Sequence, residues 1–95
     1  MTPAEFEAAV LRAEGPVVVD FWAPWCTPCD AVHPILDALP LPVVRVDVDE
    51  SPDVAGRYGV LSLPTVILFE GGAPRAEVLG AQPRSRFERA FSDWL

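Results

Sequence analysis

The sequence contains no lysine and only two cysteines, and these scarcities exclude several classes of protein. All 7 basic residues are arginines scattered along the chain, and the formal net charge is -7. Because nucleic acids and anionic membranes are polyanions, an acidic chain without a basic patch is not expected to bind either of them. Two cysteines alone also cannot build the multi-disulfide framework of a small secreted protein.

The chain likewise lacks the long apolar runs of membrane and export sequences. No run approaches the roughly 18 apolar residues of a membrane-spanning helix. The segment from Met1 to Glu5 carries neither a basic flank nor an apolar stretch, so a secretory signal is not expected. We therefore expect a protein of the cytoplasm, and its acidic surface favours a monomer.

The chain is rich in apolar residues, which make up 51% of its 95 residues. This is enough to form a hydrophobic core that needs no bound metal or disulfide bond for stability. The pattern predicts one α/β domain over residues 1–95, in the order helix, strand, helix, strand, short helix, strand, strand, helix. Thr2 and Glu5 form a capping box at the first helix, and Ser51 is expected to cap the short one. The expected strands cover Val17–Trp22, Val43–Val48, Thr65–Phe69 and Ala76–Leu79. A helical stripe of apolar residues near the C-terminus predicts a last helix that buries Phe87, Ala90, Phe91, Trp94 and Leu95.

Cys26 and Cys29 lie where a helix is predicted to begin, just after the first strand. In a C-x-x-C pattern at a helix start both sulfurs fall on one turn, and the helix N-terminus stabilises a thiolate on the first cysteine. We expect Cys26 to attack a substrate disulfide and Cys29 to resolve the mixed disulfide. Pro28 stiffens the turn between them.

A zinc site is the rival interpretation, because His33 adds a third ligand, but the chain has no further Cys or His for a fourth.

Asp20 is a lone carboxylate inside the first apolar strand. Burial should raise its pKa, so that Asp20 can accept the proton of Cys29 as that thiol attacks. The alternative is an exposed carboxylate at a strand end. Trp22 is expected to pack in the interior, and Trp25 to border the surface where substrates dock.

The segment Val19–Cys29 closely resembles the active-site segment of thioredoxins. The resemblance extends in the same order over nearly the whole chain, through Pro34–Leu36, Val46–Asp49, Tyr58–Val60, Leu63–Thr65, Leu68–Phe69, Gly72 and Val78–Gly80. It implies the thioredoxin fold: a central mixed sheet flanked by helices. Since Met1 and Thr2 align with the end of the family's first strand, the sheet should have four strands and lack that edge strand. An uncovered edge is also a route to dimerisation.

The resemblance also implies roles for particular residues. Pro64 matches the family's cis-proline, which faces the cysteine pair, and the backbone of Leu63 pairs with the substrate segment in a form of strand addition. Arg45 stands where thioredoxins often carry a lysine near the buried aspartate, and it is expected to influence the charge of Asp20. The remaining docking surface is expected to comprise Trp25, Val60, Gly80 and Ala81.

Two active-site positions depart from the family pattern. Thr27 replaces the usual glycine, and its hydroxyl is placed to hydrogen-bond the Cys26 thiolate, which would make the pair more oxidising. Asp30 replaces a basic residue, and its charge opposes a thiolate on Cys26. The two effects oppose each other, so they leave the reduction potential open.

The resemblance implies a protein disulfide reductase that binds no cofactor and is recharged by a thioredoxin reductase using NADPH. Its implied targets are disulfide-containing proteins such as ribonucleotide reductase, peroxiredoxins and methionine sulfoxide reductases. Two alternatives remain open from the sequence. One is an oxidase or isomerase in an oxidising compartment, and the other is a non-catalytic binding or sensor module.

Overall fold

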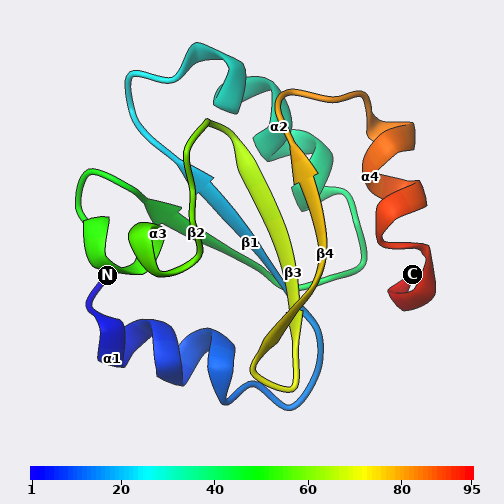
Figure 1. Ribbon diagram of the computed structural model, residues 1–95. Helices are drawn as coiled ribbons and strands as arrows, with labels where there is room; N and C mark the ends of the chain where they lie inside the picture. Colours follow the sequence, from blue (N-terminus) through cyan, green and yellow to red (C-terminus); the bar gives the residue numbers. More distant parts are fainter.

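The computed structural model describes residues 1–95 as a four-stranded mixed sheet with helices on both faces (Figure 1). The strands are β1 (Val17–Trp22), β2 (Val43–Asp47), β3 (Thr65–Glu70) and β4 (Ala73–Leu79). The helices are α1 (Pro3–Phe6), α2 (Thr27–Asp37), α3 (Pro52–Arg57) and α4 (Arg84–Ala90). A π-helical segment, Glu7–Leu11, continues α1, and a 3-10 turn, Ser92–Trp94, follows α4. None of these helices is long and apolar enough to span a bilayer.

The strand order is β2-β1-β3-β4, which places β1 and β3 in the centre. β1 pairs with β2 in parallel and with β3 antiparallel, and β4 closes the sheet as an antiparallel hairpin strand. Gly71 and Gly72 form the tight turn of this hairpin, and both have positive φ, which glycine adopts without steric cost. The predicted four-stranded mixed sheet is confirmed.

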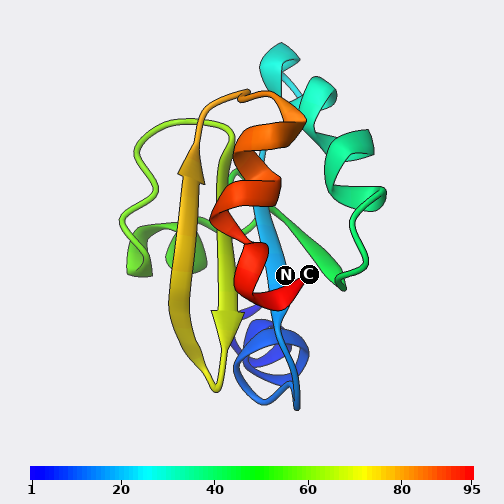
Figure 2. The ribbon, with the colours of Figure 1, turned by 90° about the vertical axis from the view of Figure 1, so that its right-hand side faces the viewer.

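The sheet separates two hydrophobic cores, because successive residues of a strand point to opposite faces. The core on the α1 and α3 face contains Phe6, Val10, Val17, Val19, Phe21, Val46, Val54, Ala55, Ile67 and Phe69. The core on the α2 and α4 face contains Val18, Val32, Leu36, Leu39, Val66, Leu68, Val78, Phe87 and Phe91. Figure 2 faces α4, which lies over the strands on this side of the sheet. The alternation puts Asp20 on the same face as Val18, and therefore toward α2.

Most of the predicted elements are confirmed, and the differences lie at their ends. The capping box of Thr2 and Glu5 is present, with both of its hydrogen bonds. β4 begins at Ala73 rather than near Ala76, because pairing with β3 continues to the glycine turn.

Two predictions about side chains were wrong. Ser51 occupies the N-cap of α3 but does not cap it; its hydroxyl donates to the carbonyl oxygen of Met1 at 2.7 Å and accepts from the Met1 amine at 2.8 Å. Leu95 is exposed rather than buried, because the chain leaves the α-helix for a 3-10 turn after Phe91 and the helical stripe loses its spacing.

Candidate active site

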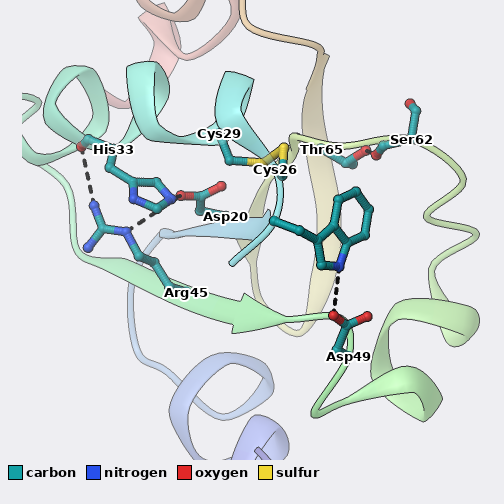
Figure 3. The surroundings of a disulfide bond; sticks show 9 residues. Asp20, Cys26, Cys29, His33, Arg45, Asp49, Ser62 and Thr65 are labelled. Carbon is teal, nitrogen blue, oxygen red and sulfur yellow. Dashed lines mark hydrogen bonds and ion pairs between the residues drawn. A yellow bond between two sulfur atoms is a disulfide. The ribbon is translucent and has the colours of Figure 1, made fainter. Parts of the chain in front are cut away.

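Cys26 and Cys29 form a disulfide at the N-terminus of α2, with their Cα atoms 5.4 Å apart (Figure 3). The chain leaves β1 at Trp22 and turns so that the Cys26 amide donates to the Ala23 carbonyl at 3.0 Å. Cys26 is the N-cap of α2, and the Cys29 amide donates to its carbonyl oxygen at 3.2 Å. Cys26 therefore stands at the N-terminal end of α2, where the helix dipole favours a negative charge on its side chain.

The two cysteines differ slightly in their exposure to solvent. Cys26 is 4% exposed and Cys29 is fully buried. Pro28 occupies the first turn of α2, where a missing N–H costs nothing. Thr27 and Asp30 are exposed on the same turn, and the Thr27 side chain makes no hydrogen bond while the cysteines are oxidised.

Asp20 lies beneath the disulfide, between Cys29 and the side chains of His33 and Arg45 (Figure 3). Its carboxylate is fully buried, with Oδ2 3.1 Å from His33 Nε2 and 3.5 Å from Arg45 Nε. These are ion-pair distances, but the groups are not oriented as hydrogen bonds, so neither carboxylate oxygen has a hydrogen-bond donor. Burial raises the pKa of Asp20, and the charges of His33 and Arg45 oppose this rise.

Arg45 reaches this carboxylate from β2, directly across the parallel pairing with Asp20. Its Nη2 also donates to Asp37 Oδ1 at 2.9 Å and to the backbone oxygen of His33 at 3.2 Å. The guanidinium therefore divides its charge between a buried and an exposed carboxylate, and Asp20 receives only part of it. The sequence-based expectation that Arg45 lies near Asp20 is confirmed.

The segment before β3 lies against the disulfide. The Leu63–Pro64 peptide bond is cis, and Leu63 packs against Ala23, Cys26 and Cys29. The Gly80 amide donates to the Pro64 carbonyl at 2.9 Å, which ties the turn after β4 to this segment.

The expected docking residues are only partly brought together. Trp25 is 68% exposed, and its indole N–H donates to Asp49 Oδ2 at 2.7 Å. Val60, in contrast, packs against the core on the α1 and α3 face, and Ala81 is exposed. Leu61 is 98% exposed beside this segment and was not singled out from the sequence.

The zinc interpretation has no geometric support in the structure. No group of three or more His, Cys, Asp or Glu side chains is placed to hold a metal ion. His33, the third potential ligand, contacts Asp20 instead.

The contact between His33 and Asp20 was not predicted from the sequence, which indicated a surface or half-buried helical residue near the pair, with a role in tuning or proton transfer as the alternative. One signal could have found it. His33 follows Cys29 by four residues, so the two share one face of α2. That face covers the side of β1 on which Asp20 points.

Comparison with known proteins gives the same result over nearly the whole chain. The thioredoxin family model matches residues 1–93. The chain is 41% identical to thioredoxin M4, chloroplastic, of Arabidopsis thaliana, over all of this chain and 52% of that protein. It is 39% identical to a thioredoxin of Alicyclobacillus acidocaldarius, over all of this chain and 95% of that protein. It is also 42% identical to a bifunctional thioredoxin reductase/thioredoxin of Mycobacterium leprae, over 98% of this chain and 22% of that protein.

The order of the strands, the disulfide at the start of α2 and the match over residues 1–93 lead to one assignment. The chain belongs to the thioredoxin family, has the thioredoxin fold and is a thiol–disulfide oxidoreductase, a protein disulfide reductase whose redox-active centre is the Cys26–Cys29 pair.

Proposed function

We propose that the reduced protein attacks substrate disulfides with the Cys26 thiolate and releases the product through Cys29. The observation that carries this order is the difference in burial: Cys26 retains some exposure at the helix N-terminus, whereas Cys29 is fully buried. In the first step the Cys26 sulfur bonds to one substrate sulfur, and the other substrate sulfur leaves with the electron pair as a thiolate.

The second step resolves the mixed disulfide. Cys29 loses its proton to the carboxylate of Asp20, and the resulting thiolate attacks the Cys26 sulfur. The bond between Cys26 and the substrate breaks, the substrate sulfur leaves as a second thiolate, and the Cys26–Cys29 disulfide forms. Asp20 suits this role because it lies beside the pair and because burial raises its pKa, which makes the carboxylate a better base.

We also propose that an extended substrate segment docks beside Pro64. The backbone of Leu63 would pair with it, since the side chain of this residue already packs against the cysteines. Trp25 and the Gly80 turn border this surface, and Val60 and Ala81 would contact only the outer part of a bound segment. Thr27, Pro28 and Arg45 would tune the pair rather than contact the substrate.

The electrons would come from a thioredoxin reductase that uses NADPH, and the substrates would be disulfide-containing proteins. The relative from Mycobacterium leprae, named as both reductase and thioredoxin, supports this pairing. A dithiol that is recharged in this way works in a reducing compartment, and we propose the cytoplasm, although several relatives are named chloroplastic. We further propose that residues 1–95 form one domain, since the two cores share one sheet. We also propose that the protein acts as a monomer, because its formal net charge of -7 disfavours self-association.

Trapping the mixed disulfide tests the order of the two steps. Cys29→Ser should reduce no insulin in turnover but should retain insulin as a covalent adduct that dithiothreitol releases. Cys26→Ser is the matched control and should retain none. An adduct that forms with Cys26→Ser and not with Cys29→Ser would reverse the two roles.

The reduction potential separates a reductase from an oxidase or isomerase. Equilibration against dithiothreitol buffers should give about −270 mV, as for thioredoxin. A value of about −180 to −120 mV would contradict the proposed direction of the reaction, because that is the range of oxidising relatives.

A further inference from the structure

We propose that His33 is a positioning residue for the resolving step, which shares a proton with Asp20 and exchanges that proton with solvent. The inference rests on the proposed role of Asp20 as the base for Cys29. Asp20 has no exposed surface, so a proton that it accepts from Cys29 needs a partner through which to leave. The His33 side chain is 21% exposed and thus connects the buried carboxylate to water.

Of the two side chains that contact the Asp20 carboxylate, only His33 can pass this proton on. Arg45 also approaches the carboxylate, but a guanidinium stays protonated at all ordinary pH values and cannot pass a proton on. Asp37 contacts Arg45 and is more than half exposed, so it changes the local charge without touching Asp20. Imidazole, in contrast, has two ring nitrogens, so it can accept a proton on one and release a proton from the other.

The position of His33 is held by two further contacts. Its backbone oxygen accepts from Arg45 Nη2 at 3.2 Å. Its ring lies edge-on to Trp22, with 5.3 Å between the ring centroids and 84° between the planes. These contacts hold the ring with Nε2 3.1 Å from Asp20 Oδ2, close enough for a proton to pass once the ring turns to align the two atoms.

The proposed exchange involves no oxidant beyond the substrate disulfide. The proton of Cys29 moves to Asp20 as the Cys29 sulfur bonds to Cys26. The proton then passes from Asp20 Oδ2 to His33 Nε2, and the imidazolium releases the proton on Nδ1 to water. Asp20 is left ionised and His33 neutral with its proton on Nε2, and exchange with water returns that proton to Nδ1 before the next turnover. The imidazolium form also favours the ionised carboxylate, which is the form that can accept the Cys29 proton.

The test uses the full chain and the small disulfide 5,5′-dithiobis(2-nitrobenzoate) in stopped flow. Attack by Cys26 releases the first thionitrobenzoate in a phase that depends on reagent concentration. Attack by Cys29 releases the second in a phase that does not. In His33→Ala the second phase should slow at least threefold at pH 7, its pH midpoint should rise, and the first phase should stay within twofold of the parent.

Two companion measurements separate proton exchange from packing. His33→Gln keeps a polar side chain of similar size, and its second phase should be as slow as that of His33→Ala. Added imidazole should restore the second phase in His33→Ala, because the residue removed leaves a partly exposed space beside Asp20, and should leave the parent unchanged. Cooperative urea unfolding of both variants checks that they fold.

The outcomes distinguish this proposal from the function on which it rests. A second phase in His33→Ala with the parent's rate and pH midpoint would overturn the role of His33 and leave the dithiol mechanism intact. A slow second phase that imidazole does not restore would also overturn it, since the loss would then be one of packing. A parent protein that shows no second phase at all would instead remove the proposed resolving role of Cys29.

Discussion

Replacing Asp20 by asparagine should stabilise the oxidised protein, and the gain should grow as the pH rises. The side chain is fully buried, and burial raises the pKa of its carboxyl above the ordinary value of 3.8. A carboxyl group whose pKa is higher in the folded state contributes stability that is complete below its unfolded pKa. That stability is lost as the pH rises from the unfolded pKa through the folded pKa. Asparagine does not titrate and keeps its contribution throughout.

The magnitude follows from the same linkage. Each unit by which the folded pKa exceeds the unfolded one costs the parent about 1.4 kcal/mol once the pH lies above both values. A domain of this length has a total stability of about 5–14 kcal/mol, so even one unit is easily measured. The advantage of Asp20→Asn should be smallest near pH 4, increase through the titration and then remain constant.

Urea unfolding followed by tryptophan fluorescence between pH 4 and pH 9 measures this difference. The protein is kept oxidised, so that neither cysteine titrates. Asp37→Asn is the matched control, because it removes an exposed carboxylate that also contacts Arg45. Its effect should stay within about 1 kcal/mol at every pH, as expected for a surface ion pair. An advantage of Asp20→Asn that is constant or falls with rising pH would refute the raised pKa.

Three further predictions test other parts of the structure. Arg45→Gln removes one of the charges that lower the pKa of Asp20, so the pH midpoint of the resolving step should rise in the stopped-flow assay. An unchanged midpoint would show that the 3.5 Å contact between Arg45 and Asp20 does not affect this step. Trp25→Ala removes an exposed ring beside the disulfide and should raise KM for insulin reduction at least fivefold, which is equivalent to about 1 kcal/mol. The alkylation rate of Cys26 should stay unchanged. Phe87→Ala opens a cavity in the core between α4 and the sheet and should lower the free energy of unfolding in urea by about 3–5 kcal/mol. A decrease below about 1 kcal/mol would mean that the surrounding side chains fill the cavity.

The sequence predicted the central part of the fold well because its signals are local and strong. β1 and β3 are apolar runs rich in β-branched residues, and the structure buries both on two faces. The capping box of Thr2 and Glu5 depends only on residues three apart, and it too is present. The spacing of Cys26 and Cys29 already indicated the chemistry.

The sequence could not show which groups, distant along the chain, meet in the folded protein and compete for the same hydrogen-bond partner or position. Ser51 has the residue type of a helix cap, but the backbone of Met1, 50 positions away, takes its hydroxyl. Leu95 continues a helical spacing that the backbone abandons after Phe91. The sequence placed His33 on a helix near the cysteine pair and left a role in tuning or proton transfer open, but it did not show which group His33 contacts. Its contact with Asp20 requires knowing that α2 crosses the face of β1 toward which that carboxylate points.

The central place of β1 has a consequence for amide hydrogen exchange. Both edges of β1 are paired, one with β2 and one with β3, whereas β2 and β4 each leave one edge open. Amides on the open edges should exchange through local fraying, while those of β1, and of β3, which is also paired on both edges, should exchange only when the whole fold opens. Asp20 belongs to β1, and the turn that carries Cys26 follows directly from this strand. Heat or denaturant should therefore abolish disulfide reduction at the same midpoint as the fold, with no inactive folded form before it.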